Sequence, residues 1–401
     1  MRRLLAISTI RSDYDLMSGL YRLLDQDAEI DLKLLVAGAH LSHNFGYSVN
    51  LIRKDGFDIL AEIENLIDSD SIRSRLKTAS VFLQNAVDIV WNWNPELILY
   101  AGDREDVLVG GMLGTYLNIP TAHFFGGDHE RDGHSDTVVR HATSKLSTVH
   151  FVSIEEHRQR LISMGESPDR IFVIGNIALD KFIHSPSWEK EDIFLRIPEG
   201  KQLEGYALVI YHPVDQEREI VGENFINILD VLLDRGIPAI VSYPNSDPGN
   251  HFIVERIRQY ESNTNVWCYK NLDRDFFISI FKNCRFLIGN SSAGIMEAAS
   301  VPVAAINVGE RQRGRFAGEN VVFCDPDYAS IDRAVTQVLS SSFQQRVKLI
   351  ANPYGDGYSC NRAFEIIKQK DFRQIRLKIE DPLDLHKNEF ALSGVDTTWK
   401  E

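Results

Sequence analysis

The segment 287–299 combines a short apolar run with residue types that suit an anion-binding turn. Its glycine and asparagine favour turn conformations, and Ser291 and Ser292 are good helix N-caps. Small side chains there leave backbone N–H groups exposed at the positive end of a helix, where a phosphate binds well. Glu297 follows one to two helical turns later, and its carboxylate can accept hydrogen bonds from a sugar diol. By itself the segment fits an ordinary strand–turn–helix connection with a capping serine better.

Cationic side chains follow several other predicted strands. Arg311, Arg313 and Arg315 lie within five residues of one another, which makes a local positive patch in an acidic protein. His212 directly follows a strand and is either a packed structural imidazole or a phosphate donor. Arg11 begins a helix, where it could clamp a phosphate, although a solvated arginine beside an N-cap is the better interpretation for an isolated residue. The arginine cluster and the serine turn together favour a diphosphate site more than either does alone.

Acidic side chains dominate two further loops. Residues 102–106 place four consecutive charges, starting with Asp103, between an apolar strand and a Gly-rich helix, although Asp103 could also be a simple N-cap. Residues 126–141 hold two glycines followed by many Asp, Glu, His and Arg side chains, and both a solvated loop and an acid–base loop fit them. His129 and His134 could bind a metal, but no HxH or HExxH spacing occurs, so an acid–base loop is preferred.

Strand and helix signals alternate along the chain, which predicts parallel sheets with helices on both faces. The expected strands are 4–10, 30–36, 97–101, 120–125, 149–152, 171–174, 207–211, 238–242, 266–269, 286–288, 303–306 and 321–323. The expected helices are 16–24, 71–93, 107–117, 136–146, 155–164, 225–233, 251–260, 273–282, 331–339, 343–350 and 362–370. The predicted fold class is therefore α/β, with two doubly wound parallel-sheet domains in tandem and a ligand in the cleft between them.

A charged stretch with prolines and glycines at 180–204 interrupts this alternation and marks a domain boundary. The expected domains are residues 1–184, residues 185–362, and a C-terminal helix with a polar tail at 363–401. The tail from residue 379 onward lacks a pattern, so we expect it to be partly disordered or to lie on the surface.

Composition limits the classes of function. The chain has 401 residues and a formal net charge of −14, which argues against nonspecific binding to nucleic acid or to a membrane surface. The first apolar run is interrupted by Arg11 and Asp13, so it predicts a buried strand rather than a signal peptide. No apolar run approaches the length of a membrane span. The 4 cysteines are scattered, which is typical of reduced thiols in a cytoplasmic protein.

Assembled in order, these loops resemble the hydrolysing UDP-N-acetylglucosamine 2-epimerases of sialic-acid and related nonulosonic-acid biosynthesis. The resemblance covers residues 1–370 and rests on an ordered set of motifs rather than on any one of them. The motifs are Arg11-Ser12-Asp13-Tyr14, Gly102-Asp103-Arg104, Gly126-Gly127-Asp128, Asp136 with Arg140-His141, 175–180, Tyr211-His212-Pro213, 243–247, Gly289-Asn290-Ser291-Ser292 with Gly294, Glu297, and 309–315.

The resemblance implies a glycosyltransferase-B-like fold that holds a sugar nucleotide between two domains, with no metal and no redox cofactor. In that family a base removes the proton at C2 while the nucleotide leaves from C1. Water then adds to the resulting glycal and gives the free 2-epimeric sugar and UDP. The implied partners are the UDP-sugar, UDP, and further copies of the chain in a dimer or tetramer.

The family's functional positions can be transferred to this chain residue by residue. By resemblance, Ser291, Ser292 and Arg11 bind the diphosphate, Glu297 binds the ribose, and His212 and Arg311 assist at the phosphates. The expected catalytic residues are Asp103, Asp128, Asp136, Arg140, Asp180 and His212, and the expected substrate-binding residues are Arg11, Arg104, Asn245, Ser291, Ser292, Gly294, Glu297 and Arg311.

One position departs from the pattern. Many relatives have a glutamate immediately before the Gly-Gly pair, where this chain has Phe125, and often a glutamate after the pair, where this chain has Asp128. Either Asp128, His129 or Glu130 takes over the missing role, or the substrate is another sugar, such as a 2,4-diacetamido-2,4,6-trideoxyhexose. The alternative functions are a non-hydrolysing epimerase, a glycosyltransferase of the same fold, and a non-catalytic sugar-nucleotide sensor.

Overall fold

The computed structural model describes residues 1–69, 71–130, 135–214, 219–244, 249–270 and 272–384. The chain forms two compact units. The first unit comprises residues 1–129, 135–178 and 358–384, and the second comprises Glu130 and residues 179–357. The sequence-based boundaries lie at 184 and 362, whereas packing passes from one unit to the other at 178 and 357.

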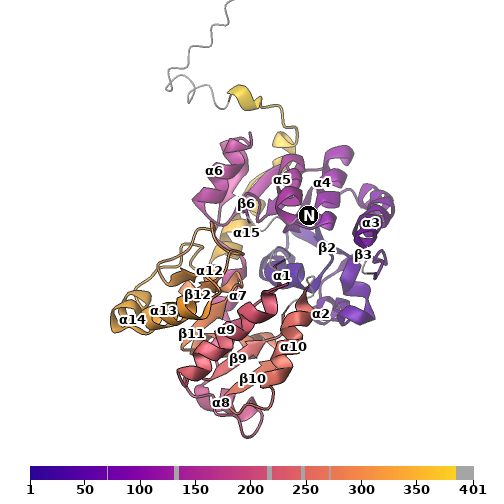
Figure 1. The fold of residues 1–401 in the computed structure, drawn as a ribbon. Coiled ribbons are helices and arrows are strands. Elements are labelled where there is room, and N and C mark those ends of the chain that lie inside the picture. Colours follow the sequence, from indigo (N-terminus) through magenta and orange to yellow (C-terminus); the bar gives the residue numbers. More distant parts are fainter. Residues whose placement is uncertain (70, 131–134, 215–218, 245–248, 271, 385–401) are drawn as a thin grey trace, which may run out of the picture. The chain divides into compact units, whose positions relative to one another are not determined.

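The first unit is a seven-stranded parallel sheet in the order β3-β2-β1-β4-β5-β6-β7 (Figure 1). Its strands are β1 (Arg2–Ser8), β2 (Ile30–Ala37), β3 (Ile59–Ile63), β4 (Leu97–Ala101), β5 (Thr121–Phe124), β6 (Val149–Val152) and β7 (Ile171–Val173). Its α-helices are α1 (Arg11–Asp25), α2 (Val49–Lys54), α3 (Ile72–Trp93), α4 (Glu105–Leu117), α5 (Ser135–Leu146), α6 (Glu155–Ser163) and α15 (Ser359–Gln369). The strand order reverses between β1 and β4, which makes the carboxyl ends of these strands a natural ligand position.

Alternate residues of the central strand β1 belong to two separate cores. Leu4 and Ala6 pack with residues of α1, whereas Leu5 and Ile7 pack with residues of α3 and α4. All four side chains are buried, as expected for a parallel strand that is covered on both faces. This explains why the strand is apolar throughout rather than alternating.

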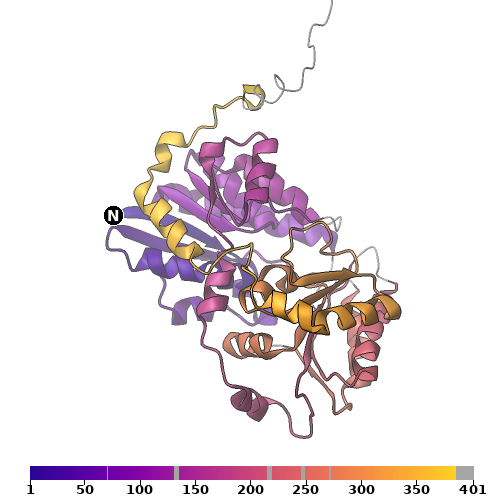
Figure 2. The same cartoon turned by 90° about the vertical axis from the view of Figure 1, so that its left-hand side faces the viewer.

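The C-terminal helix α15 belongs to the core of the first unit. Ala363 and Ile367 are buried against residues of α1, and Arg2 Nη1 donates to the Ile367 carbonyl at 2.6 Å. Figure 2 shows this yellow helix beside the N-terminal strands. The helix of the expected C-terminal segment 363–401 therefore completes the packing of the first sheet.

The second unit is a six-stranded parallel sheet in the order β10-β9-β8-β11-β12-β13. Its strands are β8 (Ala207–Ile210), β9 (Ala239–Ser242), β10 (Val266–Tyr269), β11 (Phe286–Gly289), β12 (Ala305–Val308) and β13 (Val321–Cys324). Its α-helices are α7 (Ala178–His184), which begins at the unit boundary, α8 (Lys190–Arg196), α9 (Val221–Asp234), α10 (Asn250–Tyr260), α11 (Arg274–Asn283), α12 (Ala293–Met296), α13 (Tyr328–Leu339) and α14 (Ser341–Val347). Here the strand order reverses between β8 and β11.

The expected α/β class with two doubly wound parallel sheets is confirmed. The sequence pattern missed β3, α2, α7 and α8, which are short or partly exposed and therefore carry a weak apolar signal. Residues 379–384 of the tail are exposed, and residues 385–401 lie outside the described part of the chain. Among the described helices, none has an apolar stretch long enough to span a bilayer.

Candidate functional site

The carboxyl ends of β8 and β11 meet in a tight junction. Gly289 has a φ of +143°, and a Cβ at this position would lie 2.0 Å from the carbonyl oxygen of Ile210, so only glycine fits. The buried Asn290 side chain accepts the backbone N–H of His212 on Oδ1 at 2.7 Å and donates from Nδ2 to the His212 carbonyl at 2.8 Å. Asn290 therefore fixes His212 beside the turn that follows β11.

The serine turn offers backbone donors that the protein leaves unused. The N–H groups of Ser291 and Ser292 donate to no acceptor among the described residues. Ser291 Oγ accepts the N–H of Ala293 at 3.3 Å, and a Cβ at Gly294 would approach Leu287 Cδ2 to 2.9 Å. The four residues of α12 form only one turn of the helix that was expected to follow the serines. Two unpaired N–H groups in a half-buried turn can bind an anion.

A cationic loop supports the same turn. Arg311 Nη1 donates to the Asn290 carbonyl at 3.1 Å, and the buried Gln312 donates to that oxygen at 3.3 Å. Arg315 Nη1 donates to Gln312 Oε1 at 2.8 Å and also pairs with Glu130. The structure thus brings together the predicted phosphate residues Ser291, Ser292, His212 and Arg311 at the carboxyl edge of the second sheet.

Glu297 is the C-cap residue of α12 and carries an unusual carboxyl group. Its Oε2 is buried and has no hydrogen-bond partner among the described residues. Burial raises the pKa of the carboxyl to about 7, although the nearby Arg274 and Arg315 guanidinium groups lower it. A buried, unpaired acceptor of this kind suits a ligand hydroxyl.

At the end of β1, a carboxylate organises the start of α1. Asp13 accepts the backbone N–H groups of Thr9 and Ile10 at 2.9 and 3.2 Å. Arg11 is exposed, and its Nε lies 3.6 Å from a carboxylate oxygen of Asp15. Arg104 is also exposed, at the N-cap of α4. The two predicted substrate-binding arginines of the first unit are therefore accessible from solvent.

One buried arginine joins two of the predicted acids. Arg140, on α5, pairs through Nη2 with Asp103 and through Nη1 with Asp128 Oδ2 at 2.9 Å. His157, on α6, places Nε2 3.4 Å from Asp128 Oδ1. Arg140 and Asp128 are both buried, so each charge depends on its partners. The carboxyl ends of β4 and β5 thus hold two carboxylates around one guanidinium.

A neutral histidine positions the Asp103 loop. His123, in β5, is fully buried, and burial lowers its pKa to about 3. Its Nε2 donates to the Gly102 carbonyl at 2.8 Å, and Nδ1 lies 3.2 Å from Ser144 Oγ. Since the ring stays neutral, it holds this loop without adding charge to the acid cluster.

The remaining predicted acids have other surroundings. Asp136, in the first turn of α5, lies 3.5 Å from Arg75 Nη2, and Arg75 also pairs with Glu105 at 2.6 Å. Asp180 is buried in α7, within the second unit. Asn245 lies outside the described residues.

The loop after β5 contains a strained aromatic residue and a histidine pair. Phe125 has a φ of +67°, a left-handed conformation that a bulky residue rarely adopts and that often marks a functional site. His129 Nδ1 lies 3.2 Å from His141 Nε2, with the rings stacked. Burial, together with His129 and Arg140, lowers the pKa of His141.

Comparison with known proteins identifies the family. Residues 22–368 match the family described as UDP-N-acetylglucosamine 2-epimerase. The chain belongs to this family. The expected resemblance is thereby confirmed.

Named relatives of this epimerase-family chain cover most of its length. It is 34% identical, over 92% of the chain and 96% of the relative, to a protein from Legionella pneumophila named UDP-N,N'-diacetylbacillosamine 2-epimerase (hydrolyzing). It is 28% identical to a UDP-N-acetylglucosamine 2-epimerase from Neisseria meningitidis, over 85% of the chain and 88% of the relative. A crystal structure of a UDP-GlcNAc 2-epimerase from Neisseria meningitidis bound to UDP-GlcNAc matches with a TM-score of 0.77 and 17% identity, and covers 92% of this chain and 100% of that one.

Several residues of the epimerase's candidate site were not singled out from the sequence. His123 lies inside a strand, His157 begins a helix with no motif around it, and Arg75 lies on the long helix α3. Arg274 was also not singled out. Its only sequence signal is that it lies at the start of the predicted helix 273–282, which follows the predicted strand 266–269. His123, His157 and Arg75 contact the site through tertiary packing, which residue spacing does not reveal.

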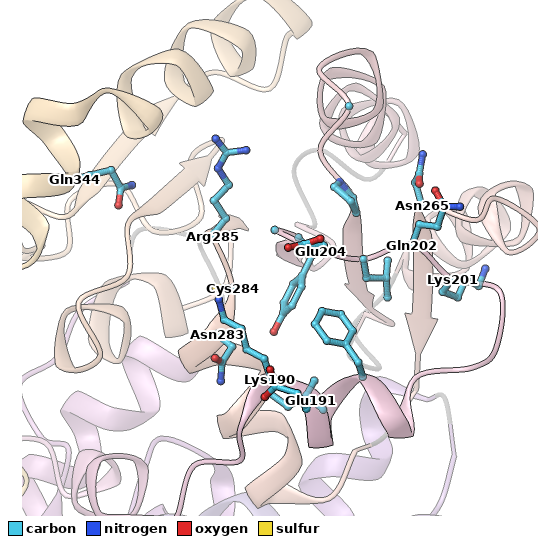
Figure 3. Close-up of a pocket in the computed structure, with 17 residues that line it drawn as sticks. Lys190, Glu191, Lys201, Gln202, Glu204, Asn265, Asn283, Cys284, Arg285 and Gln344 are labelled. Carbon is cyan, nitrogen blue, oxygen red and sulfur yellow. The ribbon is translucent and has the colours of Figure 1, made fainter.

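A cavity of about 1180 Å³ lies elsewhere in the second unit (Figure 3). Its lining includes Tyr206, Pro238, Asn265 and Arg285, which directly precede β8, β9, β10 and β11. The cavity therefore lies at the amino edge of the epimerase's second sheet, whereas the serine turn lies at the carboxyl edge.

Proposed function

We propose that this protein is a hydrolysing UDP-sugar 2-epimerase. Its substrate is UDP-N-acetylglucosamine or a UDP-2,4-diacetamido-2,4,6-trideoxyhexose, and its products are UDP and the free 2-epimeric sugar used for nonulosonic acids such as sialic or legionaminic acid. The observation that carries the proposal is the 34% identity, over 92% of the chain, to a relative named as a hydrolysing 2-epimerase.

The second unit binds the nucleotide in this proposal. The unpaired N–H groups of Ser291 and Ser292, with Arg311 and His212, provide the donors that a departing diphosphate requires. Gly294 lets the turn pack closely, and Glu297 accepts the ribose hydroxyls. Donors that are already fixed by Asn290 need little rearrangement when negative charge develops on the leaving oxygen.

The first unit moves protons in this proposal. During elimination the C2–H bond breaks, its electron pair forms the C1=C2 bond, and the C1–O bond breaks toward UDP. Water oxygen then bonds to C1 and gives up one proton to a carboxylate, while the C1=C2 electron pair takes a proton from a carboxylic acid to form a new C2–H bond on the opposite face. Asp103, Asp128 and Asp136 are the proposed proton carriers, and Arg140 orients the first two.

The other predicted residues keep their proposed roles by family correspondence. Arg11 and Arg104 are exposed cations that can meet a phosphate or sugar oxygen. Asp180 and Asn245 complete the proposed set, the first as a catalytic acid and the second as a substrate contact. The reaction as proposed uses no metal or redox cofactor.

Incubation with each of the two candidate UDP-sugars in D2O tests the function. Free 2-epimeric sugar carrying deuterium at C2, together with UDP, is the expected result by proton NMR and mass spectrometry. Deuterated product still attached to UDP would instead support a non-hydrolysing epimerase. If neither sugar exchanges its C2 proton, the epimerase proposal is wrong, and tight UDP binding would then favour a sensor.

We also propose that the enzyme works in the cytoplasm as a homodimer or homotetramer. Leu76 and Trp91 on α3 and Tyr116 on α4 are 74%, 61% and 82% exposed. Large apolar side chains on neighbouring exposed helices are typical of a protein–protein contact. This surface supports assembly through the first unit.

A further inference from the structure

Two oppositely charged, half-buried side chains of the second unit each carry a buried polar atom and are not paired with each other. Glu297 Oε2 and Arg274 Nε both lack a hydrogen-bond partner among the described residues. No nitrogen of Arg274 lies within the 4.0 Å of a Glu297 oxygen that defines an ion pair. Buried polar atoms are normally satisfied, so each of these atoms needs an explanation.

Both residues lie at the edge of the sheet that carries the serine turn. Arg274 is the first residue of α11, which follows β10, and Asp273 fixes the start of that helix by accepting the Asp275 N–H at 3.1 Å. Glu297 follows the turn after β11. Glu297 Oε2 and Arg274 Nε are thus two buried, unpaired atoms at one edge of one sheet, and the guanidinium lowers the pKa of the Glu297 carboxyl.

We propose that Arg274 and Glu297 bracket the ribose of the bound nucleotide, with Arg274 as a specificity-determining residue that donates to a ribose hydroxyl oxygen. The proposal rests on the proposed function, in which Glu297 accepts from the ribose diol. It adds a contact that none of the sequence motifs assigned.

The chemistry of a hydroxyl explains why the two charges are held apart. A hydroxyl donates one hydrogen bond and accepts others, so a vicinal diol can donate to the carboxylate and accept from the guanidinium at once. A direct ion pair would occupy both groups and would compete with the ligand. A nucleotide without these hydroxyls leaves the buried atoms Glu297 Oε2 and Arg274 Nε unpaired, and sites built to pair with a hydroxyl reject ligands that lack it.

Calorimetric binding of UDP and of 2',3'-dideoxy-UDP to the full-length protein tests the proposal. Wild type should bind UDP about 100-fold more tightly than the dideoxy nucleotide, because the dideoxy nucleotide loses charge-assisted hydrogen bonds. Arg274→Gln should weaken UDP binding about 10-fold and leave dideoxy-UDP binding within about twofold of wild type. Arg274→Lys, which keeps the charge but loses the planar guanidinium, should fall between them.

Arg285→Gln is the matched control. Arg285 is exposed at the amino edge of the same sheet, within the cavity in Figure 3, so its loss should change neither affinity. Thermal denaturation of each variant confirms that the second unit stays folded.

The outcomes separate this inference from the proposed function. If Arg274→Gln weakens UDP and dideoxy-UDP equally, or weakens neither, the ribose contact is wrong. If wild type binds UDP with the expected preference but turns over no UDP-sugar, the inference holds and the proposed function fails. If wild type binds no UDP, both are overturned.

Discussion

Glu297 illustrates how the charge state of one residue can control ligand affinity. Its carboxyl has a pKa of about 7 because burial opposes ionisation. The group is therefore largely protonated below pH 7 and ionised above it. Since only the carboxylate accepts from both ribose hydroxyls, UDP affinity should rise about tenfold between pH 6 and pH 8 and change little above that range. Titration calorimetry across this range measures the effect.

Glu297→Gln provides the control for this pH dependence. The amide cannot ionise, so any slope that remains in the variant comes from the phosphates of UDP or from other residues. Identical slopes in wild type and variant would show that Glu297 does not take part.

Substitution of Asp103 tests whether the first unit transfers protons while the second unit binds the nucleotide. Asp103→Asn keeps the size of the side chain but removes the carboxylate that pairs with the buried Arg140. Turnover should fall at least about 100-fold, because an amide cannot exchange a proton. UDP affinity should stay nearly unchanged, and Asp136→Asn should behave in the same way. Ser291→Ala combined with Arg311→Ala should do the opposite and weaken UDP binding.

Steady-state kinetics and calorimetry on the same variants check this assignment. Near-full turnover in either aspartate variant would exclude that residue as a proton carrier. A large loss of UDP binding in Asp103→Asn would mean that the acid cluster also shapes the nucleotide site.

At the scale of single residues, the sequence predicted which residues lie in the candidate site better than it predicted which side chains pair with one another. Asp103, Asp128 and Arg140 were all expected in the site, but their meeting around one guanidinium depends on three separate elements. His157 was missed because it contacts Asp128, which is distant in sequence, and Arg274 was missed because no motif surrounds it. Local motifs identify the candidate residues, whereas tertiary packing determines which of their charged groups form ion pairs.

The junction of β8 and β11 is the element on which the proposed phosphate site depends. A Cβ at Gly289 would lie 2.0 Å from the Ile210 carbonyl oxygen, so Gly289→Ala must separate the two central strands. We expect a loss of at least about 3 kcal/mol in the free energy of unfolding and a loss of UDP binding. Urea denaturation and calorimetry measure the two effects.

Gly236→Ala is the matched control for this change. Gly236 also has a positive φ, +65°, but nothing lies within 4 Å of a Cβ placed there. Gly236→Ala should lower the free energy of unfolding by only about 1 kcal/mol, through backbone strain, and should leave UDP binding intact. Equal costs at the two glycines would show that the close approach to Ile210 is unimportant.

Strands were predictable from the sequence where all of their residues are buried and nearly all of them are apolar. Strands such as β4 and β6 are buried throughout and coincide with their predicted bounds. The edge strand β3 is largely half-exposed, so its pattern is too weak to stand out. The single turn α12 shows the opposite error, since the helix expected after the serine turn ends at Met296 and a 3-10 turn at Ala298–Ser300 follows it.

For the whole molecule, the fold is better preserved than the sequence. The match to the Neisseria meningitidis crystal structure reaches a TM-score of 0.77 at 17% identity. Buried parallel strands require apolar residues of suitable size rather than particular ones, so many sequences satisfy the same two sheets. The alternation of strands and helices therefore predicted the class, while the polar loops carried the family signal.

Assembly is the remaining prediction at this scale. Trp91 and Tyr116 are exposed on α3 and α4 of the first unit, and burying both against another copy would remove large apolar surfaces from water. Light scattering after size exclusion should show a dimer or tetramer for wild type and a monomer for the double variant Trp91→Glu, Tyr116→Glu. Leu349→Glu, at an equally exposed apolar side chain of the second unit, should leave the oligomer unchanged. A monomeric wild type would contradict the proposed assembly, and an unchanged oligomer in the double variant would place the contact on another surface.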